Sequence, residues 1–66
     1  MQAYQERVIA EKGELDDKIA KLTAFVGGTT FASLDDDERS LLSIQLQHMK
    51  GYSEILGQRI AAFGDA

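Results

Sequence analysis

The fold of this protein is decided by residues 33–63, which read SLDDDERSLLSIQLQHMKGYSEILGQRIAAF. Successive residues of an α-helix are turned by about 100°, so the apolar residues of this stretch fall on one side of a helix, over an arc of about 200°. A single partner helix covers only about 100°. The stretch therefore predicts a helix that needs at least two neighbours. The residues of this arc are Leu34, Leu41, Leu42, Ile44, Leu46, Met49, Tyr52, Ile55, Leu56, Ile60 and Phe63.

The chain itself supplies one of these neighbours, a helix predicted over about residues 2–26. Its apolar stripe is narrow, about 60–100°, so one partner covers it. Glycines at 27 and 28 predict the end of this helix, with a left-handed cap. The connector at residues 27–32 is short, so the two helices are predicted to be antiparallel neighbours. The stripe consists of Tyr4, Val8, Leu15, Ile19, Leu22 and Val26.

The second helix is predicted to begin at Ser33 and to run to Phe63, where Gly64 stops it. We expect the Ser33 hydroxyl to accept from the amide of Asp36, and the acids at 35–38 to favour the positive end of the helix dipole. Consecutive carboxylates point to different sides of a helix, so no metal site is predicted here. The register places Val8 beside Leu56, Leu15 beside Met49, Tyr4 beside Ile60, and Leu22 beside Leu41 and Leu42.

Length and composition predict one domain spanning residues 1–66 that assembles with copies of itself. A domain of this size buries only about 60% of the surface that its unfolded chain exposes, and the chain has no cysteine to add a disulfide. We therefore predict an all-α protein, an antiparallel two-helix hairpin that self-associates into a helical-bundle oligomer. The predicted interface between copies consists of Leu41, Ile44, Gln45, His48 and Ile55, with a face that contains Leu46 and Ile60 as the alternative.

Two polar residues of this interface allow more than one interpretation. A buried amide at Gln45 would pair with its symmetry mate and fix the register, or else the seam is partly exposed there. His48 is the single histidine of the chain, so a metal role is disfavoured, and a pH-sensitive interface stays open.

Charge and motifs exclude several function classes. The net charge of −4 argues against a general DNA or RNA binder, and no apolar run is long enough to span a membrane. The N-terminus has no signal-peptide pattern, so we expect a cytoplasmic protein. The sequence has no cysteine nucleophile, strained serine elbow or phosphate loop, and a two-helix unit offers no cleft for catalysis. We predict no enzyme activity and no cofactor.

A set of spaced motifs covers nearly the whole chain, from Tyr4 to Phe63. It resembles short proteins encoded by phages and prophages, of the crAss-phage-related kind. The polar elements Glu11-Lys12, Gln45, Tyr52 and Arg59 carry most of this resemblance, because a hairpin alone does not require them. The motifs read Arg7-Val8-x-x-Glu11-Lys12-x-x-Leu15, Leu22-x-x-Phe25, Phe31-x-x-Leu34, Leu41-Leu42-x-x-Gln45, Met49-x-x-Tyr52 and Leu56-x-x-Arg59-Ile60.

These proteins are similar to the helical-hairpin part of phage anti-defence sponges, the anti-CBASS and anti-Thoeris proteins. The sponges form oligomers and bind cyclic nucleotide signals between subunits. The resemblance thus implies sequestration of an immune signal, without catalysis, in the cytoplasm of an infected bacterial host. It transfers no individual ligand-binding residue to this chain.

The residues near the open end of the hairpin are compatible with such a ligand. Aromatic rings stack bases, and cationic side chains neutralise phosphates. The alternative is that both tyrosines belong to the core with a solvated hydroxyl and that Arg59 pairs with a local acid. Likewise, Lys12 interrupts the apolar stripe of its helix either as a packed stem with a solvated head or as part of a polar site. The predicted ligand-binding residues are Tyr4, Arg7, Lys12, Tyr52 and Arg59.

Two other function classes stay open. One is a protein-interaction module, an antirepressor or an inhibitor of a host enzyme, in which the apolar face of the second helix docks onto a host protein. The other is a structural component of a virion, for which no residue gives specific evidence.

Overall fold

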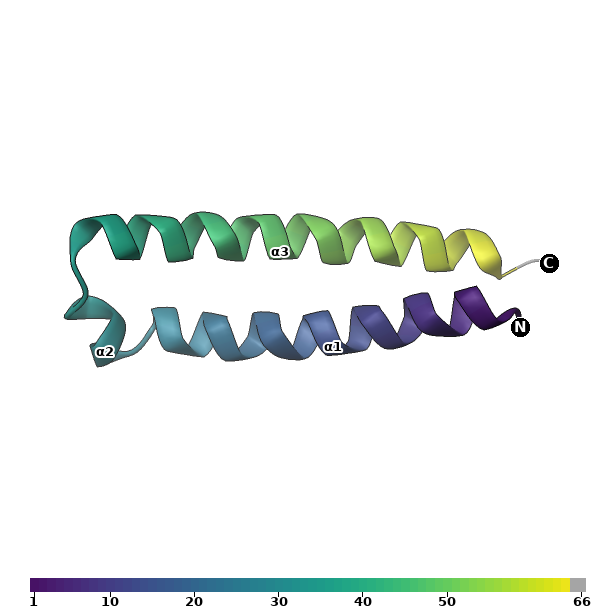
Figure 1. The fold of residues 1–66 in the computed structure, drawn as a ribbon, viewed down its shortest axis with the longest axis horizontal. Helices are drawn as coiled ribbons and strands as arrows, with labels where there is room; N and C mark the ends of the chain where they lie inside the picture. The colour runs from purple at the N-terminus through teal and green to yellow at the C-terminus, as the bar shows by residue number, and fades with distance from the viewer. Residues whose placement is uncertain (65–66) are drawn as a thin grey trace.

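The computed structural model describes residues 1–64, which form three helices and no strand. The helices are α1 (Ala3–Val26), α2 (Thr29–Ala32) and α3 (Asp36–Phe63). Figure 1 shows α1 and α3 running antiparallel along their whole length, with α2 closing one end and the start of α1 and the end of α3 at the other. The described part of the chain is a rod of 49 × 15 × 14 Å. The prediction of an all-helical protein is confirmed.

The end of α1 at Val26 agrees with the prediction, but its cap differs. The backbone of Gly27 is right-handed, with φ −81°, and its amide donates to the carbonyl of Thr23 at 3.2 Å. No residue in the described range 1–64 has a positive φ. The predicted left-handed cap is therefore wrong, because the chain leaves α1 through a tightened last turn and enters α2 directly.

The predicted turn at residues 27–32 contains the four-residue helix α2, and α3 begins later than expected. The Asp35 carboxylate accepts from the amide of Glu38 at 2.8 Å and thus caps α3. The Ser33 hydroxyl instead donates to the carbonyl of Thr30 at 2.7 Å, so the prediction that Ser33 caps this helix is wrong. A carboxylate is the stronger acceptor for helix amides, because it also interacts with the helix dipole.

The core lies between α1 and α3, closer to the open end than to α2. Val8, Leu15 and Leu56 are buried together, and Ile19, Met49, Ile60 and Phe63 pack against them. Val8 and Leu56 share this cluster, as the predicted register implies, and Met49 packs against the cluster that holds Leu15. Leu41, predicted to face Leu22, is 63% exposed.

Aromatic pairs close the two ends of the rod. Phe25 and Phe31 form an edge-to-face pair at the α2 end, with ring centroids 6.3 Å apart. At the open end, Tyr4 forms such a pair with Phe63 at 5.7 Å. Pairs of this geometry contribute about 0.5–1.5 kcal/mol beyond their buried area. The predicted neighbour of Tyr4 was Ile60, so the observed contact differs by less than one helical turn.

Candidate ligand-binding site

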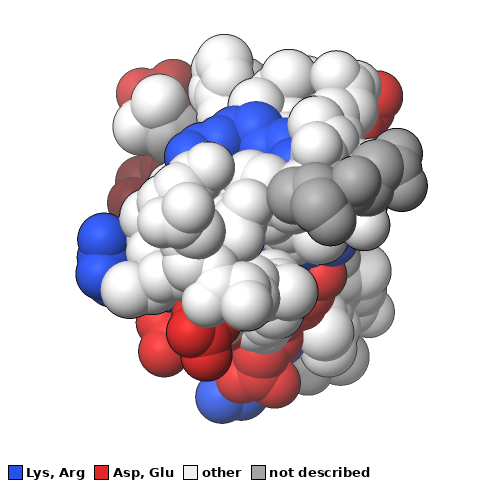
Figure 2. All heavy atoms as spheres, turned by 90° about the vertical axis from the view of Figure 1, so that its right-hand side faces the viewer, with Lys and Arg blue, Asp and Glu red and all other residues white. Residues whose placement is uncertain are grey.

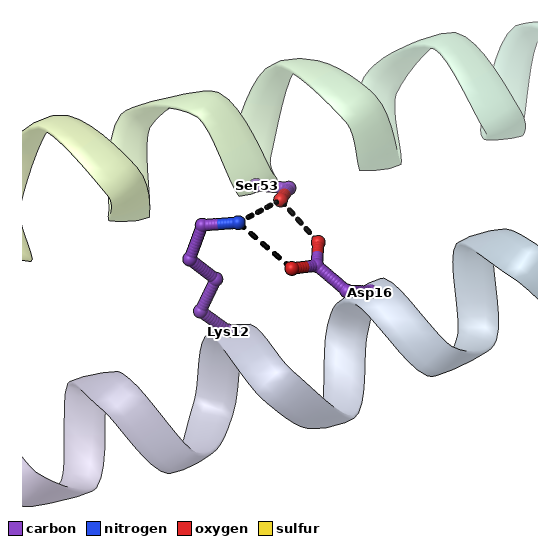
Figure 3. A network of polar contacts seen from close by, with 3 residues as sticks. All are labelled: Lys12, Asp16 and Ser53. Atoms are coloured by element: carbon purple, nitrogen blue, oxygen red, sulfur yellow. Dashed lines mark hydrogen bonds and ion pairs between the residues drawn. The ribbon is translucent and has the colours of Figure 1, made fainter.

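Three polar side chains join α1 to α3 near the middle of the rod (Figure 3). The Lys12 ammonium donates to Oδ2 of Asp16 at 2.8 Å and to Oγ of Ser53 at 3.1 Å. The Ser53 hydroxyl donates to the other carboxylate oxygen of Asp16, Oδ1, at 2.5 Å. The three groups thus form a closed ring of hydrogen bonds, in which each group is bonded to the other two.

The local sequence explains how this ring forms. Lys12 and Asp16 lie one helical turn apart on α1, where opposite charges meet. Ser53 comes from α3 and is buried. A Cβ added at Gly57 would lie 3.3 Å from Cε of Lys12, so this glycine leaves room for the lysine stem.

Sequence reasoning singled out Lys12 but missed Asp16 and Ser53. The signal was present, because the predicted register places Lys12 within one turn of Ser53. The head of Lys12 is thus held in a polar contact with the other helix rather than only reaching water.

The ring also affects the charge of Asp16. Hydrogen bonds from Lys12 and then from Ser53, aided by the lysine charge, hold the pKa of Asp16 below its usual value, against a smaller opposing effect of desolvation. The Asp16 side chain is 48% exposed, so solvent screens this interaction. Because the folded-state pKa is lowered, the ring stabilises the protein above the ordinary pKa of aspartate. This contribution is lost as the pH falls through the folded-state value.

We expect Asp16→Asn to reduce the acid sensitivity of the fold. Between about pH 5 and pH 2, the melting temperature of the wild type should fall further than that of Asp16→Asn. Circular dichroism melts at fixed protein concentration measure this difference. Asp17→Asn is the control, because Asp17 forms an ion pair only within α1, with Lys21. An identical pH dependence for wild type and Asp16→Asn would contradict the prediction.

The other predicted ligand-binding residues lie on the surface. Tyr4 is 48% exposed beside Phe63, and Tyr52 is 46% exposed on α3. Arg7 and Arg59 are exposed. Within residues 1–64, no hydrogen bond, ion pair or aromatic contact joins two of the five predicted residues. A single chain thus displays these groups without assembling them, and the predicted site stays a prediction.

A hollow at the open end of the rod adds a feature that the sequence did not reveal. Its volume of about 390 Å³ falls within the range of small-molecule sites, about 300–1,000 Å³. Gln5 is its buried polar member, and Phe63 connects it to the Tyr4 ring. Figure 2 looks onto this end, where acidic side chains gather mainly on the lower, α1 side. The hollow is lined by Met1, Gln5, Ile9, Ile60, Phe63 and Gly64.

The residues of the predicted interface are all exposed in the single chain. Ile44 and Ile55 are 49% and 53% exposed, and Gln45 and His48 are exposed as well. The Gln45 amide has a contact of 4.0 Å with the sulfur of Met49. These residues lie outside the core between α1 and α3. Their role between copies stays a prediction.

Residues 1–64 contain neither a membrane-spanning helix nor a cluster of metal ligands. No helix within residues 1–64 is both long and apolar enough to cross a bilayer. Over the same range, no three His, Asp or Glu side chains gather as a metal-binding group.

Comparison with known proteins shows which family the chain belongs to. The family model described as Sequestin matches residues 2–62. The chain belongs to the Sequestin family. This Sequestin chain is also 41% identical over 63 residues to a protein of Enterobacteria phage T4, described as an uncharacterized 7.5 kDa protein in the denB-rIIB intergenic region. The match covers 96% of this chain and 98% of the relative.

No solved structure matches this Sequestin chain. The relatives support the resemblance to small phage proteins. The family match and the T4 relative do not show the predicted link to proteins of crAss-phage-related phages.

Proposed function

We propose that this protein is a phage anti-defence protein that binds and holds a cyclic oligonucleotide signal of its bacterial host without transforming it. The observation that carries the proposal is membership of the Sequestin family, whose name denotes sequestration, together with a relative from a phage. Sequestration requires a binding surface and no catalytic group. The proposed place of action is the cytoplasm of the infected cell, where such a signal is produced.

The surface of the chain supplies the groups that this ligand requires. Exposed faces of Tyr4 and Tyr52 stack bases, each stacked base contributing about 1–3 kcal/mol. The guanidinium groups of Arg7 and Arg59 match phosphate oxygens with paired donors. Lys12 has a weaker claim, because Asp16 and Ser53 already accept two of its three N–H bonds.

The hollow at the open end supports the same proposal. Ile9, Ile60 and Phe63 give its walls an apolar part, and Gln5 adds an amide whose oxygen accepts from the backbone amide of Gln2 at 2.9 Å. The amide nitrogen is left for the polar edge of a flat base inserted between the apolar side chains. The Tyr4 ring lies against Phe63 at its rim.

Calorimetric titration with a panel of cyclic dinucleotides and trinucleotides tests the proposal. We expect one member to bind, and Arg7→Ala to weaken its affinity at least tenfold, because this substitution removes a charged partner of a phosphate. Lys21→Ala is the control, since Lys21 is 77% exposed and pairs with Asp17 within α1. After heat denaturation the ligand should be recovered chemically unchanged.

Absence of heat from every member of the panel would refute the nucleotide proposal and favour the alternative, in which α3 docks onto a host protein. Recovery of a cleaved ligand would refute sequestration itself.

A further inference from the structure

α3 carries an apolar surface that α1 does not cover. Leu41, Ile44 and Ile55 are 63%, 49% and 53% exposed. Residues spaced by three and four positions lie on one side of a helix, so this surface continues toward both ends of α3. We name it the outer stripe, and it consists of Asp37, Leu41, Ile44, His48, Gly51, Ile55 and Arg59.

Gly51 lies in the middle of the outer stripe, and no contact within the chain explains why this position has no side chain. A glycine inside a helix destabilises it relative to alanine. At Gly57 the Lys12 stem explains the missing side chain, whereas a Cβ added at Gly51 would meet nothing within 4 Å. Glycine is the residue that allows a close approach from outside. Gly13 of α1 is equally open, and it lies away from the outer stripe.

The charges of the outer stripe are complementary to those of a second outer stripe that runs in the opposite direction. Asp37 lies near its first end and Arg59 near its last, with apolar residues between them. A parallel copy would place like charges together at both ends. An antiparallel copy would place Asp37 within one helical turn of Arg59 of the partner subunit at both ends, within reach of the long arginine side chain, and would oppose the two helix dipoles.

We propose that a second copy of this chain covers the outer stripe, with the two α3 helices antiparallel and crossing between His48 and Gly51. In this register Ile44 packs against Ile55 of the partner subunit. His48 lies against Gly51 of the partner subunit, which makes room for the imidazole ring. Such an arrangement is isologous, because each contact occurs twice about a twofold axis. It forms without ligand, so its failure and the failure of nucleotide binding are separate results.

Charge reversal tests both the partner and its direction, by sedimentation equilibrium of the ligand-free protein. The wild type should have at least twice the monomer mass of 7.3 kDa. Asp37→Arg and Arg59→Glu should each weaken self-association about tenfold, because each creates two repulsive ends. An equimolar mixture of the two variants should associate like the wild type, since one chain then supplies two cations and the other two acids.

Matched controls separate the interface from helix stability. Glu38→Arg makes the same change to the helix dipole one residue away, off the outer stripe, and should keep the wild-type mass. Gly51→Ala should weaken association several-fold, whereas Gly13→Ala should leave it unchanged. A wild type at 7.3 kDa would overturn the proposal and leave the stripe to a foreign protein. A mixture that associates no better than the single variants would overturn the antiparallel direction, and equal effects of the two glycine substitutions would overturn the crossing at Gly51.

Discussion

Leu56→Ala is expected to leave much of the protein unfolded at 37 °C. Leu56 is fully buried, and Val8 and Leu15 share its cluster. Truncation of a buried leucine to alanine typically destabilises by about 2–5 kcal/mol. A chain of 66 residues has a total stability of roughly 3–10 kcal/mol at the usual value per residue. The loss is therefore comparable with the whole free energy of unfolding.

Circular dichroism melts and urea titrations at one fixed protein concentration measure this effect. Ile9→Ala is the control, because Ile9 is 40% exposed and its truncation should cost about 1 kcal/mol or less. Similar melting temperatures for Leu56→Ala and Ile9→Ala would show that the core between α1 and α3 is not as described.

The second large effect is expected from Ile44→Asp, which should reduce the protein to monomers at micromolar concentration. In one chain Ile44 is 49% exposed, so the substitution is tolerated by the α1–α3 pair. In the proposed assembly the carboxylate would be buried against Ile55 of the partner subunit. A buried charge without a counter-ion is strongly destabilising, by about 3–5 kcal/mol where one member of a buried pair is removed.

Light scattering of Ile44→Asp and of Gln47→Asp separates the effect of a charge in the interface from the effect of a charge elsewhere on α3. Gln47 is exposed on α3 away from the outer stripe, so Gln47→Asp adds the same charge to the helix without meeting the partner. Helix content should be similar in both variants. An unchanged mass for Ile44→Asp would contradict the proposed interface.

The helices could be predicted from the sequence because their limits are set by local chemistry. The apolar spacing of α1 and the glycines after Val26 determine its end, and Gly64 determines the end of α3. The register was predictable to within one turn because a short connector allows little slippage, and Val8 and Leu56 are neighbours as expected.

The cap of α3 could not be predicted with the same certainty, since it depends on a competition between adjacent acceptors. Ser33 and Asp35 both suit an N-cap, and a choice between them changes which residues remain for the turn. Once Asp35 caps α3, the preceding residues are free to form α2, whose last carbonyls include that of Thr30, the acceptor for Ser33.

The candidate site was harder to predict than the fold. Lys12 was recognised by its position in the apolar stripe of α1, but its partners depend on the exact rotation of α3, which a helical wheel does not give. A one-residue rotation would place Tyr52 rather than Ser53 opposite Lys12. For the same reason the sequence could identify exposed aromatic and cationic side chains but not the hollow beside Phe63, which exists only where the two helix ends meet.

The closed end of the rod has a consequence for how quickly the protein becomes functional. Phe25 and Phe31 are separated by six positions, so their contact closes a very short loop around α2. Once it forms, each following turn of α1 and α3 meets its neighbour at little additional cost in loop entropy, and helices elongate within nanoseconds per residue. The sequence has no proline and no cysteine, so neither isomerisation nor disulfide exchange delays this zippering. Newly made chains are thus expected to fold almost at once, and in the proposed assembly the encounter of two chains would set the pace. The onset of activity would then follow the concentration of the protein rather than its age.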